Sequence, residues 1–437
     1  MRTRAVALVL AAFAFPLGEA RGDETAAGDR TLTVEQVVDL VQRSNPRVLE
    51  VLANSRAGRN LARSALGRML PSVHLGEEYQ HWDSAYDIPF GKVSFAVRGQ
   101  DPNYFSVSGD QPLLGLIHLS HERDSEGSRQ EATLAELETA RADLKAAVQS
   151  QYLRLFEASA LEDIAKASER ELSEQVAVTQ AKLNAGVLTT ADLLRVEVAV
   201  ANAKQQEIQA HSQGEVARAA LLGAIGLSQS DARTKFAEPA TLLEQARAAP
   251  PSLAEAEQRA EAMRPELKEK RLQVEAAYHA EKGRLYSMLP DVDLEASYLH
   301  TNESLFNPTN AGFFGIKANW TIFEWGNSWY AQRAAAEQTE AAKHGAESQR
   351  RQVGVEVASS LAEARASTAV IDVAQQTIAS AEEAYRVTQA LLKAGSATTT
   401  DLLDAEAALT QARLNLTRAR YEQAIAQVSL GRSLGAR

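Results

Sequence analysis

The sequence holds one short match to a catalytic motif, close to its C-terminus. Residues Gly431 to Gly435 read Gly-Arg-Ser-Leu-Gly, the G-x-S-x-G pattern of a serine nucleophile. That motif requires a strand-to-helix turn and a histidine further along the chain to act as the base. Here the segment ends a helix-forming run and no histidine follows it. We therefore expect no catalytic serine, and no other set of residues predicts an enzyme or a bound cofactor.

Two histidines and a glutamate near the middle of the first half could ligate a metal ion. His118, His121 and Glu122 lie within about one helical turn of each other. The same spacing is typical of side chains that simply solvate a junction, and we favour this second interpretation. The chain has no cysteine and few, widely spaced methionines. Thiol catalysis, cysteine-bound zinc and a relay of thioether copper ligands are therefore excluded.

Two aspartates stand where helices are expected to begin. Thr189 and Asp192 have the spacing of a capping box, and Thr398 and Asp401 repeat it. In a capping box the two side chains hydrogen bond to each other's backbone N–H and stabilise the first turn of a helix. The spacing alone leaves open whether capping is the only role of these aspartates.

The chain repeats itself, and the repeat positions these residues. Residues 178–194 resemble residues 387–403, and the Leu-Pro-x-Val-x-Leu segment at 70–75 recurs at 289–294. The offset between the halves is 219 residues at the earlier pair of segments and 209 at the later pair. Ten extra residues must therefore lie between the two pairs in the first half. We expect them in a loop at 83–103, which is rich in Gly, Pro, Asp and Ser, because a loop accommodates an insertion at little cost.

Period-two alternation predicts a β-hairpin in each half, at about 71–114 and 290–323. Val73 and Leu75, for example, alternate with polar neighbours. Segments of about ten residues with one apolar face are typical of strands in membrane barrels, although a soluble sheet packed on helices has the same pattern. Aromatic side chains gather in or beside these hairpins, as an interfacial girdle would require. The expected girdle residues are Tyr79, Trp82, Tyr298, Trp320 and Trp325.

The remaining sequence predicts long helices. Residues 123–184 and 328–393 contain no proline and little glycine, and Ala, Glu, Gln, Arg and Leu dominate. Gly186 and Gly395 then fit the left-handed position that ends a helix. The predicted organisation is a signal peptide at 1–20, a first repeat at 32–227 with a helical hairpin at about 123–226, a linker at 228–251, and a second repeat at 252–435 with a helical hairpin at about 325–435.

The N-terminus predicts the cellular compartment of the protein, and the net charge excludes one class of partner. Residues 1–20 have a basic start, a short apolar run and a small-residue end, which predicts a secretory signal peptide. No later segment is apolar over the length that a membrane-spanning helix needs, so any crossing is expected from β-strands. The net charge of −11 argues against a nucleic-acid partner.

The tandem repeat, the Leu-Pro-x-Val-x-Leu strand openings and the Ala-Gly-x-x-Thr-Thr-x-Asp-Leu-Leu turns resemble the TolC family of outer-membrane efflux proteins, from about residue 32 to residue 435. The resemblance implies an α+β membrane protein: a homotrimer with a twelve-stranded β-barrel in outer-membrane lipid and a canal of long helical hairpins in the periplasm of a Gram-negative bacterium. It would be the passive exit duct of a tripartite efflux or type I secretion system, docking on a periplasmic adaptor and an inner-membrane pump. The alternative is a periplasmic coiled-coil adaptor or scaffold, which would normally have one helical hairpin per chain.

By position, the resemblance also implies functional residues at the two periplasmic turns. The expected adaptor contacts are Gly186, Val187 and Leu188 at the first turn and Gly395, Ser396 and Ala397 at the second. The expected entrance or gate residues are Asp192, Asp401, Asp404 and Leu392. The best-known member closes its entrance with a Tyr and an Arg where this chain has Leu392 and Ala397, so that tether is absent here. Apolar contact or the carboxylates would have to replace it, unless Asp192 and Asp401 only cap helices.

Overall fold

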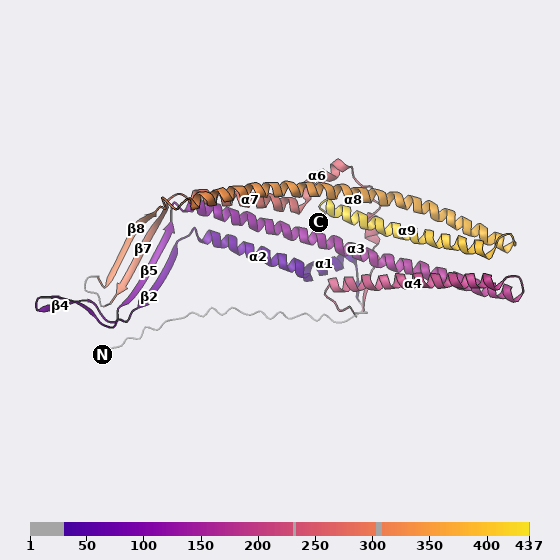
Figure 1. The fold of residues 1–437 in the computed structure, drawn as a ribbon, viewed down its shortest axis with the longest axis horizontal. Helices are drawn as coiled ribbons and strands as arrows, with labels where there is room; N and C mark the ends of the chain where they lie inside the picture. The colour runs from indigo at the N-terminus through magenta and orange to yellow at the C-terminus, as the bar shows by residue number, and fades with distance from the viewer. Residues whose placement is uncertain (1–29, 230–232, 303–307, 437) are drawn as a thin grey trace.

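The molecule is elongated, with a β-sheet at one end and helices that run from it along the long axis to two turns at the other end (Figure 1). The structure is a computed structural model and describes residues 30–229, 233–302 and 308–436. The predicted signal peptide lies outside these ranges. No helix in the described part of the chain combines the length and the apolar character needed to cross a membrane.

Two helices extend over most of the molecule: α3 (Leu116–Asn184) and α8 (Asn327–Lys393). At 1.5 Å per residue each measures about 100 Å. Both predicted helices are present, although α3 begins at Leu116 rather than at residue 123, since no helix breaker follows Gly115.

Shorter helices cover the two halves of these long ones. On the side of the sheet, α2 (Pro46–Gly67) packs on α3, and α7 (Pro265–Tyr286) packs between α3 and α8. On the side of the turns, α4 (Thr190–Ala224) returns along α3, and α9 (Thr399–Ser433) returns along α8 (Figure 1). In the described part of the chain these helices form four columns. Helices α3 and α8 are continuous columns, whereas α2 with α4, and α7 with α9, each form a column from two helices placed end to end.

Small elements gather at mid-length, where these paired helices meet. They are β1 (Arg30–Leu32), α1 (Val34–Ser44), β6 (Thr234–Phe236), α5 (Ala240–Gln245) and α6 (Leu253–Met263). Capping boxes open α1 at Thr33 and α6 at Ser252. The parallel pair β1–β6 was not predicted, because three-residue strands carry no detectable alternation.

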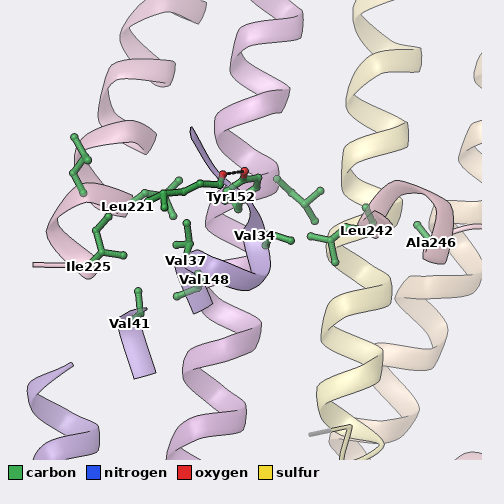
Figure 2. Close-up of a cluster of buried hydrophobic side chains, with 13 residues drawn as sticks. Val34, Val37, Val41, Val148, Tyr152, Leu221, Ile225, Leu242 and Ala246 are labelled. Atoms are coloured by element: carbon green, nitrogen blue, oxygen red, sulfur yellow. Dashed lines mark hydrogen bonds between the residues drawn. The ribbon is translucent and has the colours of Figure 1, made fainter. Parts of the chain in front are cut away.

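Tyr152 of α3 anchors this region. Its side chain is fully buried among Val, Leu and Ile side chains from α1, α4 and α5 (Figure 2). The hydroxyl lies 2.9 Å from the carbonyl oxygen of Leu32 and 2.5 Å from that of Ala237, so it connects α3 to the segments around β1 and β6. Burial raises the pKa of Tyr152 to about 12, which keeps the hydroxyl protonated as a donor.

The sheet has four antiparallel strands in the order β2-β5-β7-β8. Their bounds are Ser72–Tyr79 for β2, Asn103–Pro112 for β5, Asp291–Thr301 for β7 and Asn310–Asn319 for β8. The register aligns Leu75 with Val107 and Val107 with Tyr298, so the predicted apolar positions share one face across strands from both repeats. Polar side chains such as that of Ser108 occupy the opposite face, beside His74 and Ser297.

The ten additional residues of the first half are not an irregular loop. They form part of a second hairpin, β3 (Tyr86–Phe90) and β4 (Val93–Arg98), which projects beyond the sheet (Figure 1). The expectation of a loop at this place was therefore wrong, although β3 and β4 form a sheet separate from the four strands of the main sheet. Pro89 and Gly91 made the segment resemble a turn, but Gly91 sits in the hairpin turn itself, with φ of 71°, and Pro89 is tolerated in a two-stranded ribbon whose outer edges are unpaired.

Candidate functional site

The first candidate site is the outer face of the sheet, which is apolar and exposed. The register places Leu75, Phe314 and Ile316 on the same face. Their exposed fractions are 74%, 73% and 70%. A water-soluble protein would normally bury such a face. The opposite face is polar, and there the imidazole of His74 lies 3.3 Å from the carboxylate of Asp110. A sheet that is apolar on one side and polar on the other suits the boundary between lipid and a water-filled channel.

The predicted girdle residues lie towards the two ends of this face. Tyr79 and Trp82 are at the end of β2 that is remote from the helices, and Tyr298 lies towards the same end of β7. Trp320 and Trp325 follow β8 at the helical end. Between the two groups lie strands of about ten residues, or roughly 30 Å.

Three of these aromatic side chains have hydrogen bonds at their polar atoms. The Tyr79 hydroxyl donates to Asp101 at 2.7 Å and the Tyr298 hydroxyl to Asn310 at 2.7 Å. The indole N–H of Trp82 donates to Gln80 at 3.0 Å. An apolar ring with a satisfied polar end suits the border between hydrocarbon and headgroups.

Trp325 is held in an uncommon conformation at the start of α8. Its φ is 55° and that of Gly326 is 81°, so two successive residues are left-handed. For a bulky residue this conformation is an outlier. Glu324 supports the turn by accepting hydrogen bonds from the backbone N–H of Ser328 at 2.8 Å and the side chain of Asn327 at 3.1 Å. The indole of Trp325 is 87% exposed as a result.

The second candidate site is the pair of turns at the far end of the helices. The backbone N–H of Gly186 donates to Leu183 at 2.9 Å, and that of Val187 donates to Lys182 at 2.9 Å, with a φ of 74° at Gly186. These two bonds define a Schellman ending. The turn after α8 has the same bonds, from Gly395 and Ser396, with a φ of 75° at Gly395. Both glycines are thus in the conformation that the sequence predicts.

The capping boxes after these turns are present. Asp192 accepts hydrogen bonds from the backbone N–H of Thr189 at 3.0 Å and from its hydroxyl at 2.7 Å. Asp401 accepts the same two bonds from Thr398, both at 2.7 Å. These bonds hold the pKa of each carboxyl below its usual range. The structural role that the spacing left open is therefore real, and a gating role for these two carboxylates stays a prediction.

The remaining predicted entrance residues are placed differently. Asp404 is exposed one turn further along α9, and Leu392 is half-buried in the last turn of α8. At the turns themselves Val187 is 70% exposed, whereas Leu188 and Ala397 are half-buried.

Sequence reasoning did not single out Arg195, which connects the two turns. Its guanidinium donates to the hydroxyl of Thr400 at 3.2 Å and lies 3.5 Å from the carboxylate of Asp192. Arg195 occupies the repeat position of Asp404, 209 residues earlier. That mismatch of charge between the repeats was the signal that could have found it.

The histidines singled out by the sequence separate in the structure. His121 meets His279 of α7, with 3.3 Å between their Nδ1 atoms, and Asp124 lies beside them. Glu122 instead lies 2.9 Å from Arg68, and His118 is not part of this group. Burial and the neighbouring His279 lower the pKa of His121, so its imidazole is favoured in the neutral form.

The G-x-S-x-G match is structural. Ser433 is buried at the end of α9, where its hydroxyl shares a hydrogen bond of 2.7 Å with Ser360 and donates to the carbonyl of Leu430 at 2.8 Å. The segment is the C-terminal end of α9, packed against Ser360 of α8, and it is not a strand-to-helix elbow.

Known proteins resemble both the sequence and the fold. The chain is 26% identical over 400 residues to the alkaline protease secretion protein AprF of Pseudomonas aeruginosa, which covers 88% of this chain and 80% of AprF. CusC, described as forming a transmembrane channel, superposes with a TM-score of 0.80 at 18% identity, over 94% of each chain. VceC, an outer membrane protein of Vibrio cholerae, superposes with a TM-score of 0.76 at 17% identity, over 92% of this chain and 96% of VceC.

The outer membrane efflux protein family matches the sequence twice, over residues 37–227 and 242–436. This match decides against the periplasmic adaptor that the sequence left as an alternative, and against an enzyme. The chain belongs to the outer membrane efflux protein family, and it is a channel protein of the Gram-negative outer membrane that extends into the periplasm.

Proposed function

We propose that three copies of the chain assemble into a passive export duct across the outer membrane and the periplasm. The observation that carries the proposal is the sheet order β2-β5-β7-β8, which leaves β2 and β8 at its edges. An unpaired strand edge in hydrocarbon costs several kcal/mol for each backbone group, so the sheet must close. Four strands are too few for a barrel.

Three copies solve this geometry. In an antiparallel sheet with an even number of strands, the two edge strands run in opposite directions, so β8 of one copy can pair antiparallel with β2 of the next. Twelve strands then close without an edge, and the four helical columns of each chain make a canal wall of twelve.

We further propose that the duct works with a periplasmic adaptor and an inner-membrane pump, which engage the two turns at Gly186 to Leu188 and Gly395 to Ala397. Four of these six residues are exposed, and hydrogen bonds define the glycine ending of each turn, which supports this assignment. The cargo depends on the pump: the family is named for efflux, whereas the relative AprF is named for secretion of a protease.

At the entrance we assign the canal-facing charge to Asp404, because the carboxylates of Asp192 and Asp401 are occupied by their capping boxes. Three copies would repeat Asp404 around the axis, and a ring of like carboxylates at a narrow opening attracts cations. Leu392, in the last turn before this opening, would supply the apolar contact that narrows it.

A paired substitution on β2 tests the assembly. Leu75→Arg places a cation on the proposed lipid face and should cost about 2–4 kcal/mol near the bilayer centre. His74→Arg, one residue earlier, places the same side chain on the polar face beside Asp110 and should leave assembly unchanged. Outer-membrane extracts are compared by electrophoresis with and without heating, and purified trimers by single-channel conductance in planar bilayers. A wild-type protein recovered as a periplasmic monomer without conductance would overturn the proposal.

Cross-linking identifies the adaptor. Leu188→Cys and Ala397→Cys place single thiols at the two turns of a chain that has no cysteine of its own. Treatment of intact cells with a thiol-to-amine cross-linker should link both variants to the same periplasmic protein. A cysteine at Ser108, on the polar face of the sheet, is the control that should give no such product.

A further inference from the structure

His121, His279 and Asp124 form a cluster between the two repeats, near the end of the helices that adjoins the sheet. His121 and Asp124 belong to the start of α3, and His279 belongs to α7. Their potential ligand atoms all lie within 4.8 Å of one another, and all three residues are half-buried. Within the described ranges, no other group of three or more His, Asp or Glu side chains meets that condition.

The backbone holds this cluster in place. Gly283 of α7 brings the helix close to α3, since a Cβ atom there would lie 3.6 Å from the carbonyl oxygen of His118 and 3.7 Å from the Cβ of His121. One turn further along α3, the hydroxyl of Ser125 donates to the carbonyl of Ala276 at 2.8 Å, in a buried contact. Small residues therefore fix the separation of the helices on both sides of His279.

The ring of His121 is also oriented by stacking. It lies parallel to the ring of Tyr286, with 5.2 Å between the ring centroids and 6° between the planes. Arg123 donates twice to Oδ1 of Asp124, at 2.9 Å and 2.6 Å, so both of its hydrogen bonds use one oxygen of this carboxylate. Oriented imidazoles supported by a second layer of contacts are typical of metal ligands.

The distance between the imidazoles matches a shared metal ion. Two nitrogens bound to one tetrahedral zinc ion at about 2.0–2.1 Å are separated by about 3.3–3.4 Å. The Nδ1 atoms of His121 and His279 are 3.3 Å apart. A hydrogen bond between two neutral rings would also fit this distance, but it would make no use of the carboxylate of Asp124.

We propose that His121, His279 and Asp124 bind one divalent transition-metal ion per chain, of the Zn²⁺ class, with water in the fourth position. Two imidazoles and one carboxylate are ligands that zinc, cobalt and nickel accept. Since α3 belongs to the first repeat and α7 to the second, the ion would link the repeats where the canal meets the sheet.

Metal titration of the full-length protein tests the proposal. The protein is purified from outer membranes in detergent without a polyhistidine tag, stripped with a chelator and titrated with Zn²⁺ against a chromophoric competitor. We expect one Zn²⁺ per chain. His121→Ala and His279→Ala should each weaken binding on the order of 100-fold, and Asp124→Asn about tenfold, because each removes a ligand. His211→Ala is the matched control: this histidine of α4 lies 3.4 Å from Glu162 but, among the residues that the structure describes, belongs to no group of three potential ligands, and its loss should change nothing.

Cobalt gives an independent readout on the unaltered chain. Co²⁺ bound to the wild-type protein should show the strong visible absorption of four-coordinate cobalt, and stoichiometric Zn²⁺ should abolish it. His279→Gln, which retains a polar side chain of similar size, should lose this absorption while still forming trimers. A wild-type protein that binds no stoichiometric Zn²⁺, or a His279→Gln protein that binds it as tightly as wild type, would overturn the proposal. Neither result would affect the assignment of the chain as a duct, because that assignment depends on the sheet and the family match and not on this cluster.

Discussion

The two repeats build the same backbone with different charges, and the turns farthest from the sheet show this clearly. Each turn has a glycine in the left-handed conformation, a Schellman ending and a Thr–Asp capping box. One helical turn later, however, the first repeat carries Arg195 and the second carries Asp404. The repeated geometry therefore reflects the needs of helix ends, whereas the side chains one helical turn beyond the caps have diverged in charge.

The two repeats differ even more at the junction of two helices near mid-length, between α1 and α2 in the first repeat and between α6 and α7 in the second. In the first repeat, Asn45 caps α2 through the backbone N–H of Arg47 at 2.9 Å, and the Arg47 side chain is exposed. At the equivalent positions of the second repeat, Arg264 is 5% exposed and Glu266 is 9% exposed. Glu266 accepts hydrogen bonds from Arg264 and from Arg432 of α9. One junction is thus solvated, and the other is closed by a buried ionic network.

Removing the charge of Glu266 should have the largest effect. Glu266→Gln leaves the guanidinium groups of Arg264 and Arg432 buried with less compensation, which should lower the free energy of unfolding by about 3–5 kcal/mol. Arg47→Gln, the corresponding change in the first repeat, removes only two exposed ion pairs, with Glu50 and Glu136, and should cost less than about 1 kcal/mol. Denaturant unfolding followed by circular dichroism measures both. Equal losses would contradict the contrast between the junctions.

Acidification should remove the difference in the free energy of unfolding between the wild-type protein and Glu266→Gln. Burial alone would raise the pKa of Glu266, but hydrogen bonds from Arg264 and Arg432 outweigh it and lower the pKa from 4.5 to about 2. Because the folded pKa is depressed, the carboxylate stabilises the fold above about pH 4.5 and loses that contribution as the pH falls towards 2. The midpoint difference between the two proteins should be full at neutral pH and should shrink below about pH 4.5. A constant difference down to about pH 2.5 would refute this interpretation.

The two capping boxes should respond alike, in contrast to the junctions. Thr189→Ala and Thr398→Ala each remove a hydroxyl that bonds to the same backbone and carboxylate atoms, and each should cost about 1 kcal/mol of helix stability. Hydrogen exchange of the first turns of α4 and α9 measures the loss locally. Thr190→Ala, at the adjacent position outside the cap, is the control. A large effect at only one of the two turns would show that α4 and α9 depend unequally on their capping boxes, although the two boxes have the same geometry.

The smallest predicted effect concerns the charges that differ between the turns. Asp404→Ala should lower the preference of the open channel for cations, by about twofold in the permeability ratio, because it removes a ring of carboxylates. Arg195→Ala removes a cation from the equivalent position and should shift selectivity weakly in the opposite direction. Reversal potentials in a salt gradient across planar bilayers measure both shifts. Shifts of the same sign would mean that the two positions do not face the same opening.

Local signals made much of the fold predictable. Gly186 and Gly395, the Thr–Asp pairs and the absence of proline from 123–184 each act through neighbouring residues, so the helices, their ends and their turns could be predicted. The alternation around Leu75 predicted the faces of the sheet, because the period of a strand is independent of its partners.

Features that depend on distant residues could not be predicted. His121 and His279 are separated by 158 residues, and only the packing of α7 on α3 brings them together. The buried network of Glu266 was missed for a related reason: charged residues on a helix normally predict an exposed face, and here α9 covers it. The hairpin β3–β4 was missed because Pro89 and Gly91 are also typical of an irregular loop.

The uneven construction of the helical columns has a mechanical consequence. Helices α3 and α8 are continuous rods of about 100 Å, so an axial load applied at a turn reaches the sheet without crossing a joint. The other two columns have a joint at mid-length, where the small elements around Tyr152 pack on α4 and α9. A sideways load on the turns is therefore expected to concentrate bending at that joint. A tilt of about 5° there would displace the turns, roughly 50 Å away, by about 4 Å, while the sheet stays fixed.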